Sequence, residues 1–487
     1  MNKKGQVDVK VKTFRGLQRL KYPLELDNYQ RPYVWDESKI CQLVSDLLQH
    51  QKLGKEAPNY YLGTLLLHFD IEKECFFVID GQQRLTSLAV LYFVLYHGEL
   101  PENLKFSYRS PISTKNIQKA KTLFEKHADG KILKRTFSKL EFTLITVARE
   151  DLAFTFFDTQ NNRGISLKAT DLLKAFHLRA IDSQDSIKSE QLQKLCATRW
   201  ENVQVTGEKG LSSKENDFAP ELFHYYLWRA RNWKGTQVQR ESHDDVIRTF
   251  QDLSVPEEFP EKVSLYPGSS NSFIGSLELL NNDSFRLYPQ SIDVNNQTSQ
   301  LPFALRQPIH QGIGFFLYAQ KYASLINTLF HDENPSLEVE LFREFYFSVV
   351  LCLSQYLREL YKLAVLMYVD QFGWNELLRF ALQLDHVFGA IRFDKTYIFK
   401  EAPVKYLKEK PLNLLDVIAG AYRPEEVINF LIEDKWANSV YISDKFAHIK
   451  RGKGVQGKYL EALLNYYERE DFENKNEWII ERLGEIT

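Results

Sequence analysis

Five consecutive residues, Asp80-Gly81-Gln82-Gln83-Arg84, combine a carboxylate, a glycine, two amides and a guanidinium. They follow the apolar run 76–79, which predicts a buried strand, and precede the long apolar run 85–96, which predicts a helix buried on nearly every side. A strand-to-helix junction presents unpaired N–H groups and the positive end of the helix dipole, which suit a phosphate. The motif therefore predicts phosphate chemistry, although a turn with a capping Asp80 and a structural Arg84 ion pair fits the same residues.

Each residue type in this motif predicts a role. Asp80 is expected to hold a divalent cation or orient the attacking water, and Mg²⁺, or Mn²⁺ in its place, is the usual partner of a triphosphate. Arg84 would neutralise charge on the transferred phosphoryl group, while Gln82 and Gln83 would bind phosphate oxygens or place the water. We therefore predict Asp80, Gln83 and Arg84 as catalytic residues, Asp80 as the metal ligand, and Gly81 and Gln82 as binding residues of a nucleoside triphosphate.

Two other segments rich in polar side chains are expected to converge on the same pocket. Upstream lies Tyr29-Gln30-Arg31-Pro32-Tyr33-Val34-Trp35, and downstream lies Asn161-Asn162-Arg163-Gly164. The aromatic residues would stack on a base, although Tyr33 and Trp35 are more typical of a core, and the downstream loop fits Asx turns equally well. The binding residues predicted from these segments are Tyr29, Gln30, Arg31, Asn161, Asn162 and Arg163.

The three segments together resemble one protein family. The Asp80–Arg84 motif resembles the signature of the ParB-like N-terminal domains of the GmrSD type IV restriction family. Residues 29–35 are similar to its Tyr-Gln-Arg-x-Tyr-x-Trp element, and residues 157–167 resemble its Asn-x-x-Gly-x-x-Leu element. The resemblance covers about residues 20–180. It implies a ParB/sulfiredoxin-like fold that binds and hydrolyses nucleotides, and a role in defence against foreign or modified double-stranded DNA.

Length and composition indicate a globular protein of two or three domains, with 487 residues, 44% of them apolar and 14% aromatic. We predict an α+β protein: a ParB/sulfiredoxin-like α/β domain at 1–185, a mostly helical middle region at 186–330 and an all-α domain at 331–487. The most apolar run, 345–357, is too short to span a membrane and predicts a buried helix. Four scattered cysteines without a Cys-x-x-Cys pair argue against a zinc knuckle or disulfides and favour a cytoplasmic protein.

The sequence also limits the enzyme class. No Gly-x-x-x-x-Gly-Lys-Ser/Thr stretch is present, which excludes a P-loop NTPase. Many members of the family that the chain resembles carry a His-Asn-His nuclease with a His-Ile-x-Pro string, whose proline is missing at both His386 and His448. We therefore assign no metal nuclease site, and a packed structural histidine is the preferred interpretation of both positions.

The leading hypothesis is a Mg²⁺-dependent nucleoside triphosphatase of a restriction or anti-phage system, with DNA recognised by the helical half. One alternative is a non-hydrolysing, nucleotide-gated DNA-binding or scaffold subunit, and another is a ParB-like nuclease. A net charge of −2 excludes a polycation that coats nucleic acid, so the basic runs 1–22 and 444–458 are either local phosphate contacts or solvated faces. A partner nuclease subunit and a homodimer are both possible partners on this evidence from the sequence.

Overall fold

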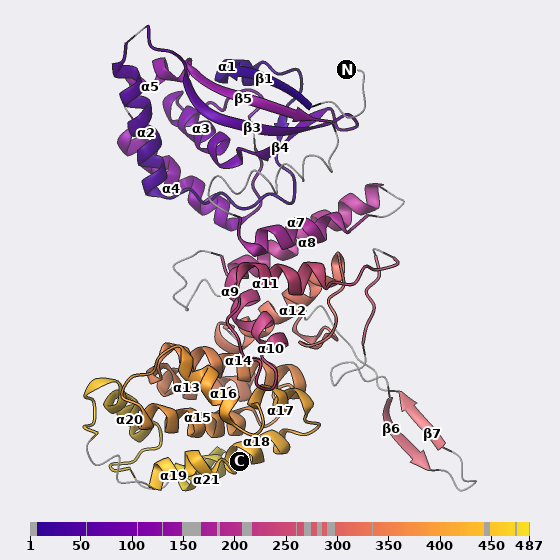
Figure 1. The fold of residues 1–487 in the computed structure, drawn as a ribbon, viewed down its shortest axis with the longest axis vertical. Coiled ribbons are helices and arrows are strands. Elements are labelled where there is room, and N and C mark those ends of the chain that lie inside the picture. Colours follow the sequence, from indigo (N-terminus) through magenta and orange to yellow (C-terminus); the bar gives the residue numbers. More distant parts are fainter. Residues whose placement is uncertain are drawn as a thin grey trace. The chain divides into compact units, whose positions relative to one another are not determined.

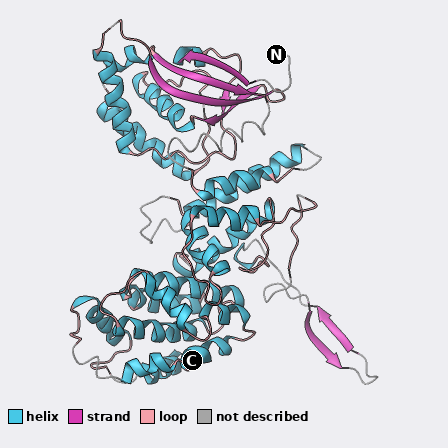
Figure 2. Cartoon of the chain, viewed as in Figure 1, coloured by secondary structure: helices cyan, strands magenta, loops and turns pink. Residues whose placement is uncertain are grey.

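The structure is a computed structural model, and it describes residues 7–54, 56–104, 106–128, 130–148, 167–182, 186–206, 217–259, 261–266, 274–279, 285–289, 298–333, 335–442, 449–472 and 475–486. The chain divides into two compact units, residues 1–205 and 206–487. The first contains a five-stranded sheet with helices, and the second is mostly helical (Figure 1, Figure 2). This arrangement confirms the predicted fold class.

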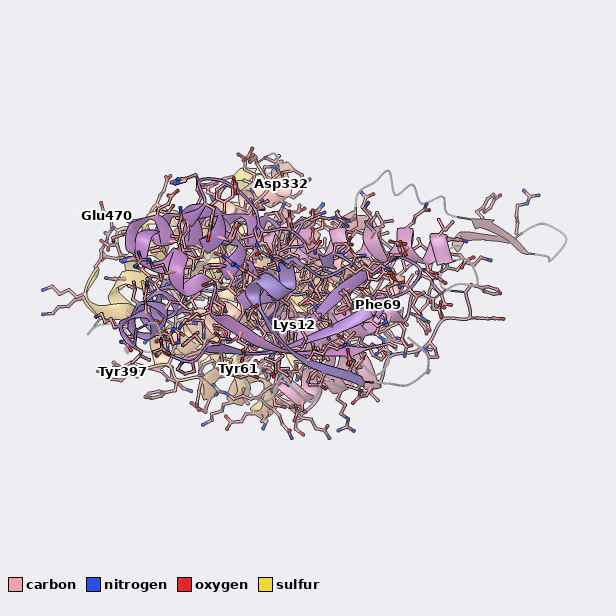
Figure 3. All side chains as sticks on the ribbon, turned by 90° about the horizontal axis from the view of Figure 1, so that it is seen from above. Lys12, Tyr61, Phe69, Asp332, Tyr397 and Glu470 are labelled. Atoms are coloured by element: carbon pink, nitrogen blue, oxygen red, sulfur yellow. The ribbon has the colours of Figure 1, made fainter. Side chains whose placement is uncertain are left out.

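The sheet of the first unit is mixed. Its strands are β1 (Val7–Thr13), β2 (Leu24–Glu25), β3 (Tyr60–Asp70), β4 (Cys75–Asp80) and β5 (Leu140–Val147), in the order β1-β5-β3-β4-β2. Strands β3 and β4 form an antiparallel hairpin, whereas β3 pairs with β5 and β2 pairs with β4 in parallel. Lys12 on β1 and Tyr61 on β3 are labelled in Figure 3, and the Tyr61 side chain is exposed. The motif begins at Asp80, the last residue of β4, and β4 lies between β3 and β2 in the sheet.

The long helix that follows the motif is one of several helices in the described part of the first unit. They are α1 (Phe14–Gln18), α2 (Glu37–Lys52), α3 (Gln82–Leu95), α4 (Pro111–His127), α5 (Gly130–Phe137), α7 (Ala169–Arg179) and α8 (Ser186–Val205). Helix α3 contacts α4 and α5, and α2 contacts the same two helices (Figure 1). Most of α3 is buried, as its unbroken apolar sequence predicts. Helix α8 packs on α7 and α4, so it belongs to the first unit although it follows residue 185.

The core of the first unit lies between the sheet and these helices. Leu65, Leu67 and Val78 from the sheet are fully buried in one cluster with Leu85 and Leu91 of α3. Helix α2 begins after Asp36, whose carboxylate accepts a hydrogen bond from Lys39 N. The apolar residues of α2 recur at helical spacing and face the same cluster. The core thus fixes the strand end and the helix start on which the motif lies.

The second unit contains many helices and one separate hairpin. Its first helices and turns are α9 (Ala219–Glu221), a π-helical turn (Leu222–Trp228), α10 (Arg229–Asn232), α11 (His243–Ile247) and a second π-helical turn (Arg248–Asp252). Then come the paired strands β6 (Ile274–Leu279) and β7 (Phe285–Pro289), a 3₁₀ turn (Thr298–Gln300), α12 (Ile313–Phe330), α13 (Leu337–Ser348) and another 3₁₀ turn (Val350–Cys352). The remaining helices are α14 (Gln355–Phe372), α15 (Leu377–Asp394), α16 (Glu401–Glu409), α17 (Leu414–Gly420), α18 (Pro424–Ile432), α19 (Lys435–Ile442), α20 (Gly454–Tyr466) and α21 (Lys475–Ile486).

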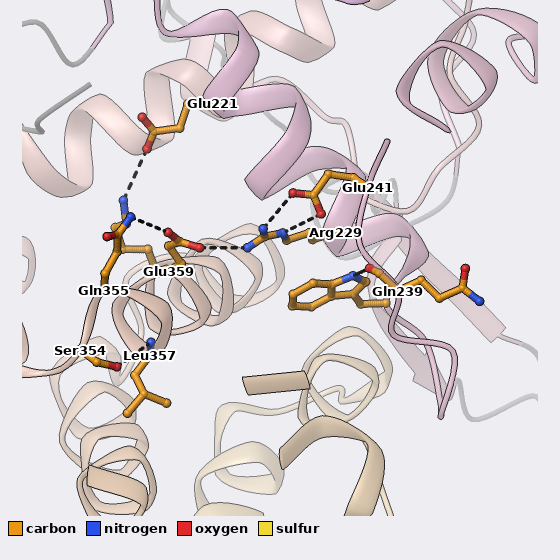
Figure 4. A network of polar contacts seen from close by, with 10 residues as sticks. Glu221, Arg229, Gln239, Glu241, Ser354, Gln355, Leu357 and Glu359 are labelled. Carbon is orange, nitrogen blue, oxygen red and sulfur yellow. Dashed lines mark hydrogen bonds and ion pairs between the residues drawn. The ribbon is translucent and has the colours of Figure 1, made fainter. Parts of the chain in front are cut away.

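Helices α14 and α15 form the buried centre of this unit. The prediction of a single buried helix over 345–357 is wrong, because α13 ends at Ser348 and α14 begins at Gln355. Ser354 is the physical reason: its side chain accepts a hydrogen bond from Leu357 N and caps a new helix (Figure 4). Among the described residues, no helix has both the length and the apolar character that crossing a membrane requires.

Candidate functional site

Gly81 connects β4 to α3 in a conformation that favours glycine. Its φ is 100°, and an added Cβ would overlap Leu65 Cδ2. The turn places Asp80 Oδ2 3.3 Å from Arg84 Nη2. The Asp80 carboxylate and the Arg84 guanidinium therefore face one another, and both side chains keep a partly exposed surface, 39% and 25% respectively.

Backbone carbonyls of β3 hold the Arg84 guanidinium in place. Nη1 donates to Leu62 O at 2.8 Å, and Nη2 donates to Thr64 O at 2.6 Å. Gly63 lies between these carbonyls with φ 96°, and an added Cβ there would overlap Arg84 Nη1. The β3–β5 pairing shifts register between Tyr61 and Thr64, so Arg84 supplies donors where the ladder is irregular. These contacts give Arg84 a structural role in addition to any role in chemistry.

The two glutamine amides of the motif bind the loop that precedes α2. Gln82 Nε2 donates to Arg31 O at 3.0 Å, and Gln83 Nε2 donates to Pro32 O at 3.0 Å. Gln83 Oε1 also accepts from Val34 N at 2.8 Å. Both ends of the Gln83 amide are thus used in positioning the loop, and the catalytic role predicted for Gln83 stays a prediction.

The same loop binds the motif from its own side. Gln30 Nε2 donates to Val78 O at 2.7 Å, at the end of β4. The Tyr33 hydroxyl is 2.7 Å from Ser87 Oγ on α3, and burial raises the pKa of Tyr33 to about 12. Tyr33 is fully buried and Tyr29 is nearly so, which identifies Tyr33 as a core residue. The structure thus brings the first two predicted segments together.

A cavity of about 640 Å³ opens beside this loop. That volume is typical of a site for a small molecule or a nucleotide. Gln82 lines the cavity from the first turn of α3. Gln30 and Arg31 line it from the loop that precedes α2. The charged residues that line it are Arg31, Arg109 and Lys174, with Glu25, Asp27, Glu102 and Glu201. Asp80 and Arg84 are not among the described residues of the lining.

Burial and nearby cations shape the charge of this cavity. Burial raises the pKa of Asp171, and Arg31 opposes that rise. Burial likewise raises the pKa of Glu201 on the lining, against the opposing effects of Lys174 and Arg109. Of these two carboxyl groups only Glu201 lines the cavity, where Glu25, Asp27 and Glu102 are further acidic residues. The lining thus contains three cationic and four acidic side chains.

Asp80 has the chemistry that a magnesium ion requires. Arg84 binds one of its carboxylate oxygens, and the side chain is 39% exposed, so a hydrated cation can reach it. Magnesium is commonly held by one or two protein carboxylates and keeps several waters. A single accessible carboxylate such as that of Asp80 therefore fits a magnesium ion.

Two cations of the cavity were not predicted as site residues. Lys174 is buried, and its Nζ donates to Gln30 O at 3.0 Å. A lysine within the otherwise apolar run 172–176 was the available signal, whereas nothing in the sequence distinguishes Arg109. The predicted binding residues Asn161, Asn162 and Arg163 lie outside the described residues.

The second unit has a polar centre of its own (Figure 4). Arg229 binds both oxygens of Glu241, at 2.8 and 3.2 Å, and Glu359 at 3.3 Å. Its guanidinium also lies against the rings of Tyr225 and Trp233. These residues line a cavity of about 360 Å³. Arg240 and Lys400 also line this cavity, so its lining carries three cationic side chains against the two glutamates.

His386 is a packed histidine, as preferred from its sequence. It is buried, its ring stacks on Tyr441, and its Nε2 is 2.9 Å from Asn438 Oδ1. Burial lowers the pKa of His386 to about 3, with a further contribution from Lys475. His386 is therefore a packing residue of the second unit. His448 lies outside the described residues.

Comparison with known proteins identifies both parts of the chain. Residues 12–178 match the model of the GmrSD restriction endonuclease, N-terminal domain, a range that contains strands β2 to β5, the motif and most of α7. Residues 192–447 match the model of a family of unknown function, DUF7834, over more than half of the chain. No curated protein matches. The chain therefore belongs to the DUF7834 family and carries at residues 12–178 a GmrSD N-terminal domain, a component of restriction systems.

Proposed function

We propose that the first unit binds a nucleoside triphosphate and hydrolyses it with Mg²⁺, as part of a restriction system that acts on DNA. The observation that carries this proposal is the position of the motif. Gln82, in the first turn of α3, lines a 640 Å³ cavity together with Arg31, Arg109 and Lys174. A helix N-terminus and three cationic side chains can bind phosphate oxygens, and this supports the proposal even though four acidic residues share the lining.

In this proposal the residues divide the work between binding and chemistry. Arg31, Arg109 and Lys174 bind phosphate oxygens in the cavity. Asp80 holds the cation, which supplies charge neutralisation at the phosphates and orients water when it is bound. Arg84, already fixed by the β3 carbonyls, presents its remaining N–H donors to the reacting phosphoryl group.

One observation favours a second function, nucleotide binding without turnover. Asp80 and Arg84 do not line the cavity among the described residues, so the cavity can hold a nucleotide without contact to the predicted catalytic pair. The first unit would then act as a nucleotide-gated clamp for DNA. Binding and hydrolysis must therefore be measured separately.

The test combines thermal shift and phosphate release over a panel of NTPs with Mg²⁺. Hydrolysis predicts both signals in the wild type, loss of release alone in Asp80→Asn, and a weakened shift in Arg109→Ala. Asp8→Asn is the matched control, because Asp8 is an exposed carboxylate on the same sheet that pairs only with the exposed Lys10 among the described residues. A shift without release from any NTP selects the clamp, and the absence of any shift, with and without DNA, overturns both functions.

We propose further that the basic segment of the second unit contacts the DNA backbone. Lys450, Arg451 and Lys453 lie together before α20, and Arg451 is partly held by Asn465 at 2.7 Å. Phosphate contacts make affinity fall with salt, and each lost contact lowers the slope of log K against log salt by about 1. Replacing Lys450 and Lys453 by glutamine should weaken DNA binding and flatten that slope by about 2. An unchanged slope would remove this segment from the proposal.

A further inference from the structure

Three side chains of metal-binding type meet at the surface of the first unit, away from the motif. Glu37 and Cys41 are four residues apart on α2 and so share one face of that helix. His127 is the last residue of α4, which packs against α2. A carboxylate oxygen of Glu37, Cys41 Sγ and a ring nitrogen of His127 all lie within 4.8 Å of one another.

These separations are close to those that a tetrahedral ion needs. Zinc binds sulfur at about 2.3 Å and nitrogen or oxygen at about 2.0–2.2 Å, which spaces its ligand atoms by roughly 3.5 Å. Glu37 and His127 are both exposed, and we expect rotation of their side chains to close the difference. Cys41 is half-buried and fixes one corner of the site.

The combination of ligands selects the kind of metal. Magnesium and calcium prefer oxygen ligands alone, whereas a thiolate with an imidazole suits zinc and its spectroscopic substitute cobalt. We propose that Glu37, Cys41 and His127 bind one Zn²⁺ ion, with water at the fourth position. The site escapes sequence inspection because it uses a single cysteine, and its histidine lies 86 positions after that cysteine in the chain.

The ion would join two helices that both lead to the nucleotide cavity. Helix α2 begins directly after the loop that contains Arg31, and Ser113 in the first turn of α4 lines the cavity. Ser113 Oγ already accepts a hydrogen bond from Tyr33 N at 3.0 Å. A metal at Glu37, Cys41 and His127 adds a second connection between the same elements. It therefore stabilises the first unit whether or not that unit hydrolyses nucleotide.

The experiment uses the full chain, purified with chelator and without a histidine tag, and titrated with Co²⁺ and then Zn²⁺. We expect one Co²⁺ per chain with the near-ultraviolet charge-transfer band of a cobalt–thiolate bond, displaced by one Zn²⁺, and a melting temperature that rises with Zn²⁺. Cys41→Ser should remove the band, and His127→Asn and Glu37→Gln should each weaken binding at least tenfold.

Matched variants separate this site from adventitious binding. Cys352 is the other partly buried cysteine and His97 is another exposed histidine of the first unit, so Cys352→Ser and His97→Asn should keep the wild-type titration. Glu37→Gln changes an exposed residue and guards against a folding defect as the cause of lost binding. A titration without the thiolate band, or a band lost equally in Cys352→Ser, would overturn the site. Neither outcome depends on nucleotide turnover.

Discussion

Each unit contains an aspartate paired with a cation, and the two pairs differ in burial. Asp80 and Arg84 are 3.3 Å apart with 39% and 25% of their side chains exposed. Asp385 and Lys475 are 2.7 Å apart and have no exposed surface. The first pair can meet a ligand, whereas the second can only hold its own helices together. Accessibility, more than residue type, therefore separates a candidate site from a structural contact.

Several hydrogen bonds satisfy the polar atoms of the buried pair, Asp385 and Lys475. Lys475 Nζ donates to Asp385 Oδ2, and Tyr459 donates to both carboxylate oxygens at 3.0 Å. The Tyr441 hydroxyl is 3.4 Å from Lys475 Nζ. Gly389 leaves room for these hydroxyls, since an added Cβ would overlap Tyr459. Burial lowers the pKa of Lys475, and the Asp385 carboxylate opposes that effect.

Removing one member of the buried pair should produce the largest loss of stability. Lys475→Met leaves the Asp385 carboxylate buried without its cation, which costs about 3–5 kcal/mol. Urea unfolding followed by tryptophan fluorescence measures the loss. Lys475→Met with Asp385→Leu is the control and should recover most of it, because no charge is then left buried. Equal losses in the single and double variants would contradict this account.

A smaller loss is expected where glycine makes room for Arg84. Gly63→Ala adds the strain of a positive φ to the displacement of the guanidinium, for a cost of about 2–3 kcal/mol. Gly54→Ala is the matched control, because Gly54 has φ 90° with nothing within 4 Å, so its cost of about 1 kcal/mol reports strain alone. If the two alanine variants are equally stable, Arg84 is not held as the structure indicates.

The pH dependence of stability should report the enclosed His386. Its pKa is lowered to about 3 in the folded state, while an unfolded histidine titrates near 6.5. Between these values the unfolded chain binds the extra proton, so stability falls as pH falls, by up to about 1.4 kcal/mol per unit. Urea midpoints between pH 7 and 5 measure this slope, and His386→Gln should reduce it. A slope that the variant leaves unchanged would assign the effect to other groups.

Much of the fold follows from local sequence. Helix α3 is one unbroken apolar run, and the β3–β4 hairpin comprises two β-rich runs around a short polar turn. Strand β5 was not predicted, since its parallel partner β3 lies about 80 residues earlier and no turn connects them directly. The helix break at Ser354 was missed because a single capping side chain determines it within an apolar run.

The candidate site was predictable in its residue types and less so in its geometry. The motif correctly predicted a strand-to-helix junction. The ion pair between Asp80 and Arg84 fits the structural alternative, and the catalytic roles of both residues stay predictions. The amide contacts of Gln82 and Gln83 were not foreseeable, because they depend on where the loop 30–34 lies in the fold. Arg109 reaches the cavity for the same reason. Local sequence patterns thus predict which side chains could take part in a site, whereas long-range packing determines which of these side chains face a ligand.

The smallest effect on stability should come from the accessible pair. Asp80→Asn removes an ion pair that water already screens, so the free energy of unfolding should change by less than about 1 kcal/mol. The same substitution should abolish phosphate release if the Asp80 carboxylate holds the cation. Lys475→Met should show the reverse pattern, with a large loss of stability and an unchanged nucleotide-induced thermal shift of the first unit. Urea unfolding and phosphate release on both variants test this; if Asp80→Asn destabilises the chain as much as Lys475→Met does, exposure does not distinguish the two pairs.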